Sequence, residues 1–390
     1  MNITCIPYNE WRKIEMEGVH TRDSHIIEHL GKRADVDTVL VINRPISYTE
    51  IFLKRRSKKL KGKIVLRYKN ATLYQVAEKT FVLDYISNDI LGPIIQKKTW
   101  FFQQFDALCL FEAYKRSLDF LNLKQSIVIA QSVFASKFVS KLTEPCVFDA
   151  WDNVLLFPSN SSMRDVFFQA YQSMAKMCPV WITNSDENIK YYKTHYNVEQ
   201  CFLVKNGVDV DIFEKEYPMP HDLVGIPRPI IGFGGRISHL VDFKLLNYLT
   251  EKHSEKSFVL IGELLAKEVF EKIEQRKNVY YLGNKTYSEY IAYIKNFDIG
   301  IVPYVVQKLQ HGGDSIKVYE YLAAGLKVVG VPAGGMQDLG EYIFLSKTSE
   351  EFSDNIDKAL SSKETICLSD FYTWNNKVNT IINILKSSIK

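Results

Sequence analysis

The chain has 390 residues, of which 46% are hydrophobic and 24% are charged, with a net charge of +4. This composition excludes a disordered chain, and the length exceeds what one hydrophobic core usually supports, so we expect two domains. None of the six cysteines forms a C-x-x-C pair or lies with histidine at zinc spacing, which argues against a structural metal and for a reducing compartment. The first residues lack the pattern of a signal peptide, and no apolar stretch is long enough to cross a bilayer, so we expect a cytoplasmic protein.

The first half of the chain alternates short apolar runs with helical patterns. Asp165–Met177 and Ser185–Tyr196 predict helices, with Ser161 or Ser162 as the N-cap of the first and Ser185 as the N-cap of the second. Continuous runs rich in Val and Ile predict strands that are covered on both faces. These runs are Thr38–Ile42, Ser126–Ala130, Cys146–Asp149, Val180–Thr183 and Phe202–Val204.

Three features of this half carry charge or chemistry. The loop Trp11–Asp23 offers His20 and Arg22, which we consider as contacts to an acceptor substrate, although a loop histidine is more often merely solvated. Residues 54–63 read KRRSKKLKGK, beside the apolar residues 51–53 and 60, and such a cluster attracts anionic lipid. A solvated loop or a phosphate-rich partner is the alternative, and the absence of a recognised motif argues against nucleic acid.

A domain boundary follows the strand that ends near Val204. The segment from Lys205 to Asp209 contains an Asn-Gly turn, and a polar, proline-containing stretch leads from it into a second strand–helix alternation. Repeated strand–helix–strand units predict parallel sheets with right-handed crossovers. The strands predicted in this half are Pro229–Phe233, Ser257–Ile261, Val279–Leu282, Ile299–Val302 and Lys327–Val331.

The first candidate ligand site of the second half is the sequence IIGFGGRI at residues 230–237. A buried strand runs into Gly234 and Gly235, where the backbone can approach a phosphate closely, and Arg236 follows. The dinucleotide fingerprint G-x-G-x-x-G fails here, because its sixth position is Ile237. Glu263 does end the next strand, as in a ribose-binding dinucleotide site, so an NAD-dependent dehydrogenase stays a weak alternative.

The second candidate is the stretch HGGDSIKVYEYLAAGLKVVGVPAGG at residues 311–335. A helix is predicted from about Ser315 to Ala324, with Gly325 as its C′ residue. Lys317 and Glu320 lie three apart and therefore share one face near the helix N-terminus. An anion there would meet Lys317, the helix dipole and unpaired backbone N–H groups, and Glu320 could accept bonds from ribose hydroxyls. A surface ion pair is the alternative, which the apolar surroundings disfavour.

This stretch resembles the nucleotide-sugar signature of GT-B-fold glycosyltransferases, in the group that includes family 4 and teichuronic acid-type enzymes. Residues 278–304, 147–157, 180–192, 203–213 and 371–385 are similar to other segments of that group, so the resemblance covers 147–385 well. It implies an α/β fold with two Rossmann-like domains facing a central cleft. Residues 1–205 would bind the acceptor, 206–370 would bind the nucleotide sugar, and the helix 371–390 would return to the first domain.

The resemblance also assigns roles by position. Glu320 would hold the ribose hydroxyls, and Lys317 and Arg236 would contact the diphosphate. Gly234 and Gly235 would form the phosphate-side loop. The remaining residues of the expected donor site are Gly283, Asn284 and Lys285 around the base, and Gly312, Gly313, Asp314 and Ser315 near the donor sugar or phosphate.

Two departures from the family pattern bear on catalysis. Gly312 stands where many members have a first glutamate, eight positions before Glu320, and Asp314 substitutes for it only in a different register. Trp151 and Asp152 stand where many members have a His–Asp pair. Asp149 and Asp152 lie at the carboxyl end of a strand and are the candidate catalytic carboxylates, and the alternative is that one of them caps the following segment. Retention or inversion of the anomeric centre stays open.

The sequence therefore predicts a glycosyltransferase that moves a sugar from a nucleotide-diphosphate sugar, expected to be UDP-linked, to a saccharide or polyprenyl-linked acceptor in bacterial surface polysaccharide synthesis. We expect no cofactor and no metal, because no Asp-x-Asp motif follows a strand in a position to hold a divalent ion against the diphosphate. The basic segment 54–63 predicts peripheral binding to the inner face of the cell membrane. The alternatives are a nucleotide-sugar epimerase of the same fold and an inactive peripheral scaffold.

Overall fold

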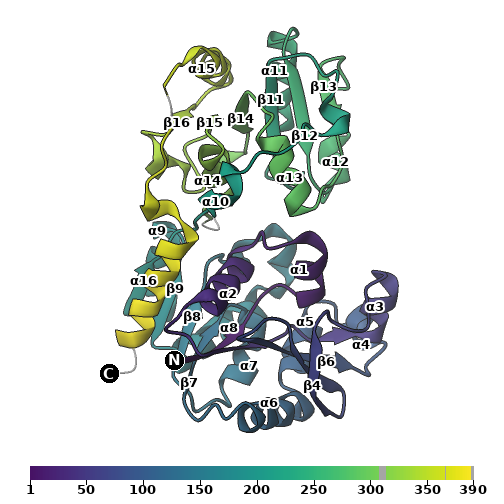
Figure 1. The fold of residues 1–390 in the computed structure, drawn as a ribbon, viewed down its shortest axis with the longest axis vertical. Coiled ribbons are helices and arrows are strands. Elements are labelled where there is room, and N and C mark those ends of the chain that lie inside the picture. Colours follow the sequence, from purple (N-terminus) through teal and green to yellow (C-terminus); the bar gives the residue numbers. More distant parts are fainter. Residues whose placement is uncertain (307–312, 365, 388–390) are drawn as a thin grey trace. The chain divides into compact units, whose positions relative to one another are not determined.

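A computed structural model describes residues 1–306, 313–364 and 366–387. The chain divides into two compact units (Figure 1). The first unit comprises Met1–Val204 and Val378–Lys390, and the second comprises Lys205–Lys377.

The first unit is built on a sheet in which ten strands are described. Along the sheet the order is β10-β9-β8-β7-β1-β2-β6-β5-β4, with the short β3 paired to β6. The strands from β10 to β6 run parallel, whereas β4 and β5 form an antiparallel extension at one edge. The strands are β1 (Asn2–Ile6), β2 (Thr38–Ile42), β3 (Ile46–Ser47), β4 (Lys63–Tyr68), β5 (Ala71–Gln75), β6 (Thr80–Ser87), β7 (Ser126–Ala130), β8 (Cys146–Asp149), β9 (Val180–Thr183) and β10 (Gln200–Leu203).

Helices cover both faces of this sheet, as the continuous apolar strands require. Ser185 caps α9 by accepting a hydrogen bond from the amide of Asn188, as predicted. The predicted caps Ser161 and Ser162 are wrong, because they lie inside a 3₁₀ turn, Pro158–Met163, that runs directly into α8. The helices are α1 (Trp11–Glu17), α2 (Arg22–Lys32), α3 (Tyr48–Leu53), α4 (Gly92–Ile95), α5 (Thr99–Phe105), α6 (Leu108–Phe120), α7 (Ser136–Val139), α8 (Arg164–Met177) and α9 (Asp186–Tyr196).

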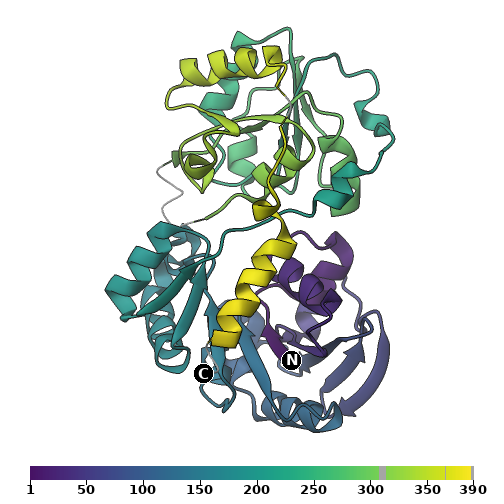
Figure 2. The ribbon, with the colours of Figure 1, turned by 60° about the vertical axis from the view of Figure 1, so that its left-hand side comes forward.

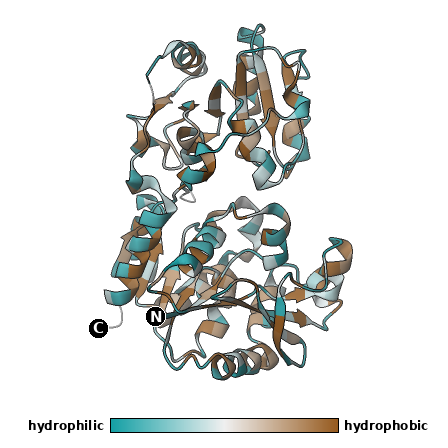
Figure 3. Cartoon of the chain, in the orientation of Figure 1, coloured by the Kyte–Doolittle hydropathy of each residue, from teal (hydrophilic) through white to brown (hydrophobic). Residues whose placement is uncertain are grey.

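The second unit contains a wholly parallel sheet in the order β13-β12-β11-β14-β15-β16. The strands are apolar and appear brown in Figure 3, whereas much of the outer helical surface is teal. The strands are β11 (Ile230–Gly234), β12 (Ser257–Ile261), β13 (Val279–Tyr281), β14 (Ile299–Val302), β15 (Lys327–Gly330) and β16 (Ile343–Leu345). The helices are α10 (Val210–Glu214), α11 (Phe243–Lys252), α12 (Lys267–Phe270), α13 (Tyr287–Ile294), α14 (Ile316–Ala323) and α15 (Ser349–Ser361).

The last helix, α16 (Trp374–Ser387), begins in the second unit, and its later residues belong to the first. Within the first unit, Asn379 accepts a hydrogen bond from Arg33, and Lys386 forms an ion pair with Asp35 at 3.1 Å. Both views of the ribbon show this part of α16, in yellow, beside the purple N-terminal region of the chain (Figures 1 and 2). These features confirm the expected α/β fold with two Rossmann-like sheets.

Both sheets reverse their strand order at one point. In the second unit, β11 lies between β12 and β14, and in the first unit β1 lies between β2 and β7. At such a point the connections leave in opposite directions and open a crevice at the carboxyl ends of the strands, where ligands of α/β proteins bind. The two places to look for a site are therefore the carboxyl ends of β11 and β14, and those of β1 and β7.

Candidate functional site

The glycine loop lies at the switch point of the second unit. Gly234 ends β11, and Gly235 has a φ of 143°, a conformation that favours glycine. A Cβ added to Gly235 would lie 2.7 Å from both Cε and Nζ of Lys317. The lysine ammonium therefore rests directly on the glycine loop, although the two residues are about 80 positions apart in the chain. The predicted phosphate loop and the predicted phosphate-binding lysine are thus brought together.

Aromatic rings position Lys317 at the start of α14. Its Nζ lies 4.6 Å from the ring centroid of Tyr304 and 5.3 Å from that of Phe233, and it donates a hydrogen bond to the Tyr304 hydroxyl. Ring faces attract a cation without neutralising it. The Lys317 ammonium therefore lies beside the first turn of α14, where unpaired backbone N–H groups also favour an anion.

Arg236 follows the glycine loop and is 46% exposed at its side chain. Its guanidinium lies 3.8 Å from the Glu263 carboxylate, which is 48% exposed and lies just after the neighbouring strand β12. Exposed pairs of this kind contribute only about 0–1 kcal/mol, so a bound anion can recruit the arginine at little cost. The structure places Arg236 beside the loop, and its predicted contact to a diphosphate stays a prediction.

Glu320 lies one turn further along α14 and is 4% exposed. Burial first, and then the charge of Glu320 and a hydrogen bond to it, raise the pKa of Tyr287 well above its ordinary value. The Tyr287 hydroxyl thus holds one position of the carboxylate that we assigned to ribose hydroxyls. A carboxylate has about four lone-pair sites, so Glu320 can keep this bond and still accept another.

Of the turn predicted to surround the base, Gly283–Asn284–Lys285, only Gly283 lies close to the strand that neighbours the glycine loop. The carbonyl of Gly283 accepts a hydrogen bond from the Gly262 amide at 2.9 Å, at the carboxyl end of β12. Lys285 instead forms an ion pair with Asp222 at 2.7 Å, and its Nζ lies 4.9 Å from the Tyr293 ring centroid. Asn284 is exposed. The backbone of Gly283 is therefore the best placed part of this turn, and the position of Lys285 gives its predicted role no support.

The residues before α14 serve the fold of the second unit. Asp314 is 8% exposed and accepts hydrogen bonds from the Asn206 amide at 2.5 Å and the Tyr319 hydroxyl at 2.7 Å. These bonds account for its burial, so its position does not support a contact to the sugar donor. Ser315 is the N-cap residue, but its side chain makes no capping bond. Gly313 has a φ of 131°, and Gly312 lies outside the described residues.

In the first unit, Asp149 forms a fully buried ion pair with Arg22. The Asp149 carboxylate accepts three bonds of 3.0–3.1 Å from the guanidinium and one of 3.1 Å from Gln131, while Arg22 also donates to the Val204 carbonyl at 2.8 Å. A general base needs a lone pair within reach of the substrate. This geometry supports neither Asp149 as a general base nor Arg22 as an acceptor contact. The ion pair instead links α2 to the end of β8 and to the residue after β10, so both residues have a structural role.

Asp152 is the better placed of the two candidate carboxylates. It is partly exposed and lines a small cavity of about 30 Å³ at the switch point of the first unit. Tyr8 and Trp151, whose rings meet edge to face at 6.0 Å, form apolar walls, and Gln131 adds a polar one. Ligand sites of this kind combine apolar faces with a few polar groups. His20 lies instead against its own loop, 2.8 Å from the Gly18 carbonyl and 3.3 Å from Glu17.

Sequence reasoning missed the tyrosines that shape both places. Tyr304, Tyr287 and Tyr8 each border a candidate site, yet none is among the predicted site residues, although Tyr287 and Tyr304 lie in the segment 278–304 that resembles the family. The only signal in the sequence is the spacing of tyrosines in YSEYIAY at residues 287–293. A tyrosine on a helix is more often part of the core, so that spacing does not identify a site.

Part of the second unit matches a known protein family. Residues 228–362 match the family model described as "Glycosyl transferases group 1". Over 136 residues the chain is 30% identical to TuaH of Bacillus subtilis (strain 168), named as a teichuronic acid biosynthesis glycosyltransferase. That match covers 34% of each protein, so it spans about a third of the relative. The predicted resemblance to GT-B glycosyltransferases of the teichuronic acid type is confirmed for this part of the chain.

Solved structures match along the whole chain. The catalytic domain of starch synthase IV from Arabidopsis thaliana, bound to ADP and acarbose, has a TM-score of 0.68 at 12% identity, covering 100% of this chain and 99% of that one. HepE of Anabaena, in complex with UDP-glucose, has a TM-score of 0.58 at 14% identity, covering 100% and 98%. At these identities the likeness shows the fold, which is that of GT-B glycosyltransferases.

Proposed function

Because residues 228–362 match a glycosyl transferases group 1 domain within a chain of GT-B fold, we propose that the protein is a glycosyltransferase that uses a nucleotide-diphosphate sugar. The observation that carries this proposal is the position of Lys317, whose ammonium rests on the Gly234–Gly235 loop at the switch point of the second sheet. A diphosphate bound there would meet a cation, glycine backbone and the N-terminus of α14 together.

Chemistry at this site would rest on stabilising the leaving group. When the bond between the anomeric carbon and the diphosphate oxygen breaks, negative charge grows on the diphosphate. Lys317 and Arg236 would interact more strongly with that charge than with the intact substrate, which lowers the barrier. Tyr304 and Phe233 hold Lys317 in place before the substrate arrives, so little reorganisation is needed.

The acceptor hydroxyl must lose a proton during transfer. In an inverting reaction a general base removes it. Asp149 and Asp152 both border the cavity of the first unit, and Asp152 is the partly exposed one of the two. In a retaining reaction the departing phosphate oxygen can take the proton, and the protein then supplies mainly positive charge. Asp152→Asn separates the two, because it would stop an inverting enzyme and only slow a retaining one.

We propose that the donor is UDP-linked and that the acceptor is a saccharide or a polyprenyl-linked saccharide of a bacterial surface polysaccharide. The named role of TuaH in teichuronic acid biosynthesis supports the second part. We also propose that the protein works at the inner face of the cell membrane, through its basic segment 54–63. No helix in the described part of the chain is long and apolar enough to cross a bilayer.

The first prediction concerns Glu320. We expect Glu320→Ala to weaken the binding of UDP by at least one hydrogen bond to a charged acceptor, about 1.5–3 kcal/mol or roughly 10–150-fold in Kd. Tyr287 shares the carboxylate, so we do not expect more than this. Calorimetric titration of both proteins with UDP measures the change.

Glu263→Ala is the matched control for this prediction. Glu263 follows β12 by two residues and would hold the ribose if the site were a dinucleotide site. We expect this variant to bind UDP as the wild type does. Loss of binding in Glu263→Ala with normal binding in Glu320→Ala would show that the ribose lies over β12 instead.

The second prediction concerns metal. Lys317, Arg236 and helix N–H groups supply the positive charge in this account, so we expect activity to survive dialysis against EDTA. Complete loss of activity, restored by Mn²⁺, would show that a divalent ion carries the diphosphate.

The reaction itself is tested by incubating the protein with a panel of nucleotide sugars. Binding of the correct donor should raise the melting temperature, because the ligand stabilises only the folded state. Release of the nucleoside diphosphate should then depend on an added acceptor extract. An epimerase would convert the nucleotide sugar without an acceptor, and an inactive scaffold would do neither.

A further inference from the structure

Six apolar side chains of the first unit are more than half exposed and come from two neighbouring segments. Phe52 and Leu53 end α3, and the others lie just before and on α4. We call this set the apolar platform. Its members are Phe52, Leu53, Ile90, Leu91, Ile94 and Ile95, and Phe52 is the most exposed of them at 82%. Single exposed apolar residues are ordinary, but clusters mark a surface that contacts something apolar.

The two segments of the apolar platform are tied to each other. The Thr49 hydroxyl on α3 donates a hydrogen bond to the Ile90 carbonyl at 2.6 Å. Just before these segments, β3 pairs with the end of β6, with Ile46 opposite Ile86. Figure 1 shows α3 and α4 next to each other at one edge of the unit, and α3 turns brown toward its end in Figure 3. The platform is therefore one continuous feature of the folded unit.

Cations border the platform. In the stretch 54–63 that follows α3, the exposed basic residues are Lys54, Arg55, Lys58, Lys59, Lys61 and Lys63, and Lys97 follows α4. Glu50 is the one acidic residue between 48 and 63, and its side chain is only 10% exposed. Despite its burial, Arg44 and Lys54 lower the pKa of Glu50 to about 2, so this carboxylate is neutralised by ion pairs.

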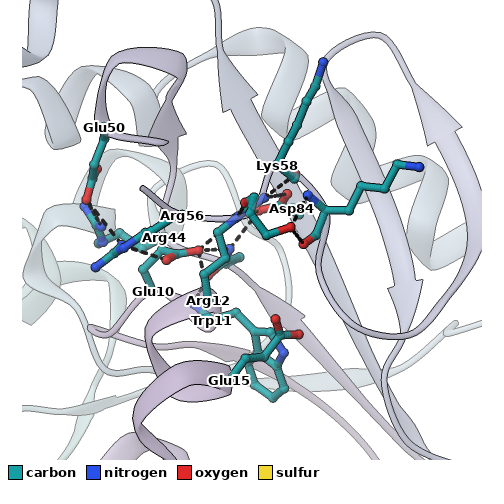
Figure 4. A network of polar contacts seen from close by, with 12 residues as sticks. Glu10, Trp11, Arg12, Glu15, Arg44, Glu50, Arg56, Lys58 and Asp84 are labelled. Atoms are coloured by element: carbon teal, nitrogen blue, oxygen red, sulfur yellow. Dashed lines mark hydrogen bonds and ion pairs between the residues drawn. The ribbon is translucent and has the colours of Figure 1, made fainter. Parts of the chain in front are cut away.

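A buried network fixes the basic segment to the body of the unit (Figure 4). Arg12 donates to the carbonyls of Ser57 at 2.6 Å and Lys58 at 2.8 Å, while Asp84 and Glu10 bind the same guanidinium. Although burial disfavours the charge, the bonds to Asp84 and Glu10 raise the pKa of Arg12. These bonds hold the backbone of residues 57 and 58 in place, so the exposed lysines of the basic segment project from an ordered part of the chain.

The same network shows that the basic segment 54–63 is not exposed along its whole length. Arg56 points inward, pairing with Glu10 at 2.8 Å and Glu50 at 3.5 Å, and Leu60 is buried, so neither belongs to the outer surface. Lys54 is partly neutralised by Glu50 at 2.8 Å. The membrane surface expected from the sequence alone thus counts more cations in residues 54–63 than the structure leaves free, and it lacks the apolar residues that the chain supplies from 90–95.

We propose that the apolar platform inserts into the headgroup region of an anionic bilayer, with the surrounding lysines and Arg55 contacting lipid phosphates. This combination of exposed apolar side chains and a cationic border is complementary to an anionic membrane surface. A second copy of the chain would bring the same cations against each other, which disfavours self-association through this face. The inference deepens the proposed membrane role and rests on it, but not on the assignment of the sugar donor.

Insertion and electrostatic adsorption predict different salt dependence. Salt screens surface charges strongly, whereas it does not weaken apolar burial. We expect the full chain to co-sediment with vesicles of phosphatidylglycerol and phosphatidylcholine, and to keep at least half of this binding in 0.5 M NaCl. Replacing Phe52, Leu53, Ile94 and Ile95 by Ser should lower binding at least tenfold at either salt concentration. Replacing Arg55, Lys58, Lys59 and Lys61 by Gln should lower it mainly at low salt.

The controls are drawn from the same unit. Leu108 and Phe120 are also more than half exposed, but they lie at the two ends of α6, so Leu108→Ser/Phe120→Ser should bind vesicles like the wild type. Binding of UDP should be unchanged in every variant, because all the substituted residues belong to the first unit and the proposed donor site belongs to the second. Normal UDP binding with failed vesicle binding would reject this inference alone, and the reverse would reject the donor site alone.

Depth of insertion decides between a bilayer and a protein partner. Phe52→Trp should show a blue-shifted emission and quenching by brominated lipids, and Phe120→Trp should show neither change on vesicle binding. Binding that vanishes in 0.5 M NaCl without quenching at position 52 would overturn insertion. A concentration-dependent dimer that the Ser variants of the platform abolish, with no vesicle binding, would instead make this face a contact between copies.

Discussion

Lys317→Ala should lower turnover by about 10²–10³-fold while changing the Kd for UDP only a few-fold. The size of the effect follows from single groups that stabilise developing charge, whose removal costs about that much in kcat. Charge on the diphosphate grows as the sugar leaves, so the ammonium helps the transition state more than the bound substrate. Initial rates with donor and acceptor, measured beside calorimetric titrations with UDP, separate the two quantities.

Lys252→Ala is the matched control, because Lys252 is an exposed lysine in the last turn of α11, on another helix of the same unit. It should leave turnover and binding unchanged. Arg236→Ala should resemble Lys317→Ala if both cations face the same phosphates. A Lys317→Ala protein with wild-type turnover would mean that the charge of the leaving group is stabilised elsewhere.

Asp149→Asn should lower the free energy of unfolding by about 3–5 kcal/mol, because it leaves the Arg22 guanidinium buried without its counter-ion. Both side chains of this pair are completely buried. Four of the five tryptophans, Trp11, Trp100, Trp151 and Trp181, lie in the first unit. Urea unfolding followed by tryptophan fluorescence therefore reports mainly on the unit that carries the substitution.

Asp152→Asn is the companion variant, since Asp152 is partly exposed and borders a cavity. We expect it to change stability by less than about 1 kcal/mol, as most substitutions away from buried networks do. An Asp149→Asn protein with wild-type stability and no activity would restore Asp149 as a catalytic residue and contradict the structural role that we assign to it.

Several strands of both sheets could be predicted from the sequence. Thr38–Ile42, Ser126–Ala130 and Ile299–Val302 are continuous apolar runs, and the structure has strands with the same bounds. The strands β1, β3, β4, β5, β6 and β16 were missed. Of these, β4 and β5 form the antiparallel extension of the first sheet, where Lys63 and Arg67 on β4 are exposed and the apolar run is interrupted. Because β4 begins at Lys63, the last residue of the basic segment 54–63, its strand pattern is not apparent in the sequence.

The candidate site could be predicted only where its residues are close in the sequence. Lys317 and Glu320 share one helix face by their spacing alone, and the glycine loop follows directly from the end of a strand. The pairing of Arg22 with Asp149 spans 127 positions and depends on packing between α2 and β8, which no local pattern encodes. The same holds for the apolar platform, since its two segments are tied by the hydrogen bond from Thr49 to the Ile90 carbonyl, which joins residues 41 positions apart.

Hydrogen–deuterium exchange of the full chain with and without UDP tests the central claim most directly. If the nucleotide binds at the switch point of the second sheet, amides of residues 234–237 and of the first turn of α14, 316–320, should exchange more slowly when UDP is bound. The strands β4 and β5 of the first unit should exchange unchanged. Protection that leaves both 234–237 and 316–320 unaffected, with UDP bound at saturation, would contradict the account.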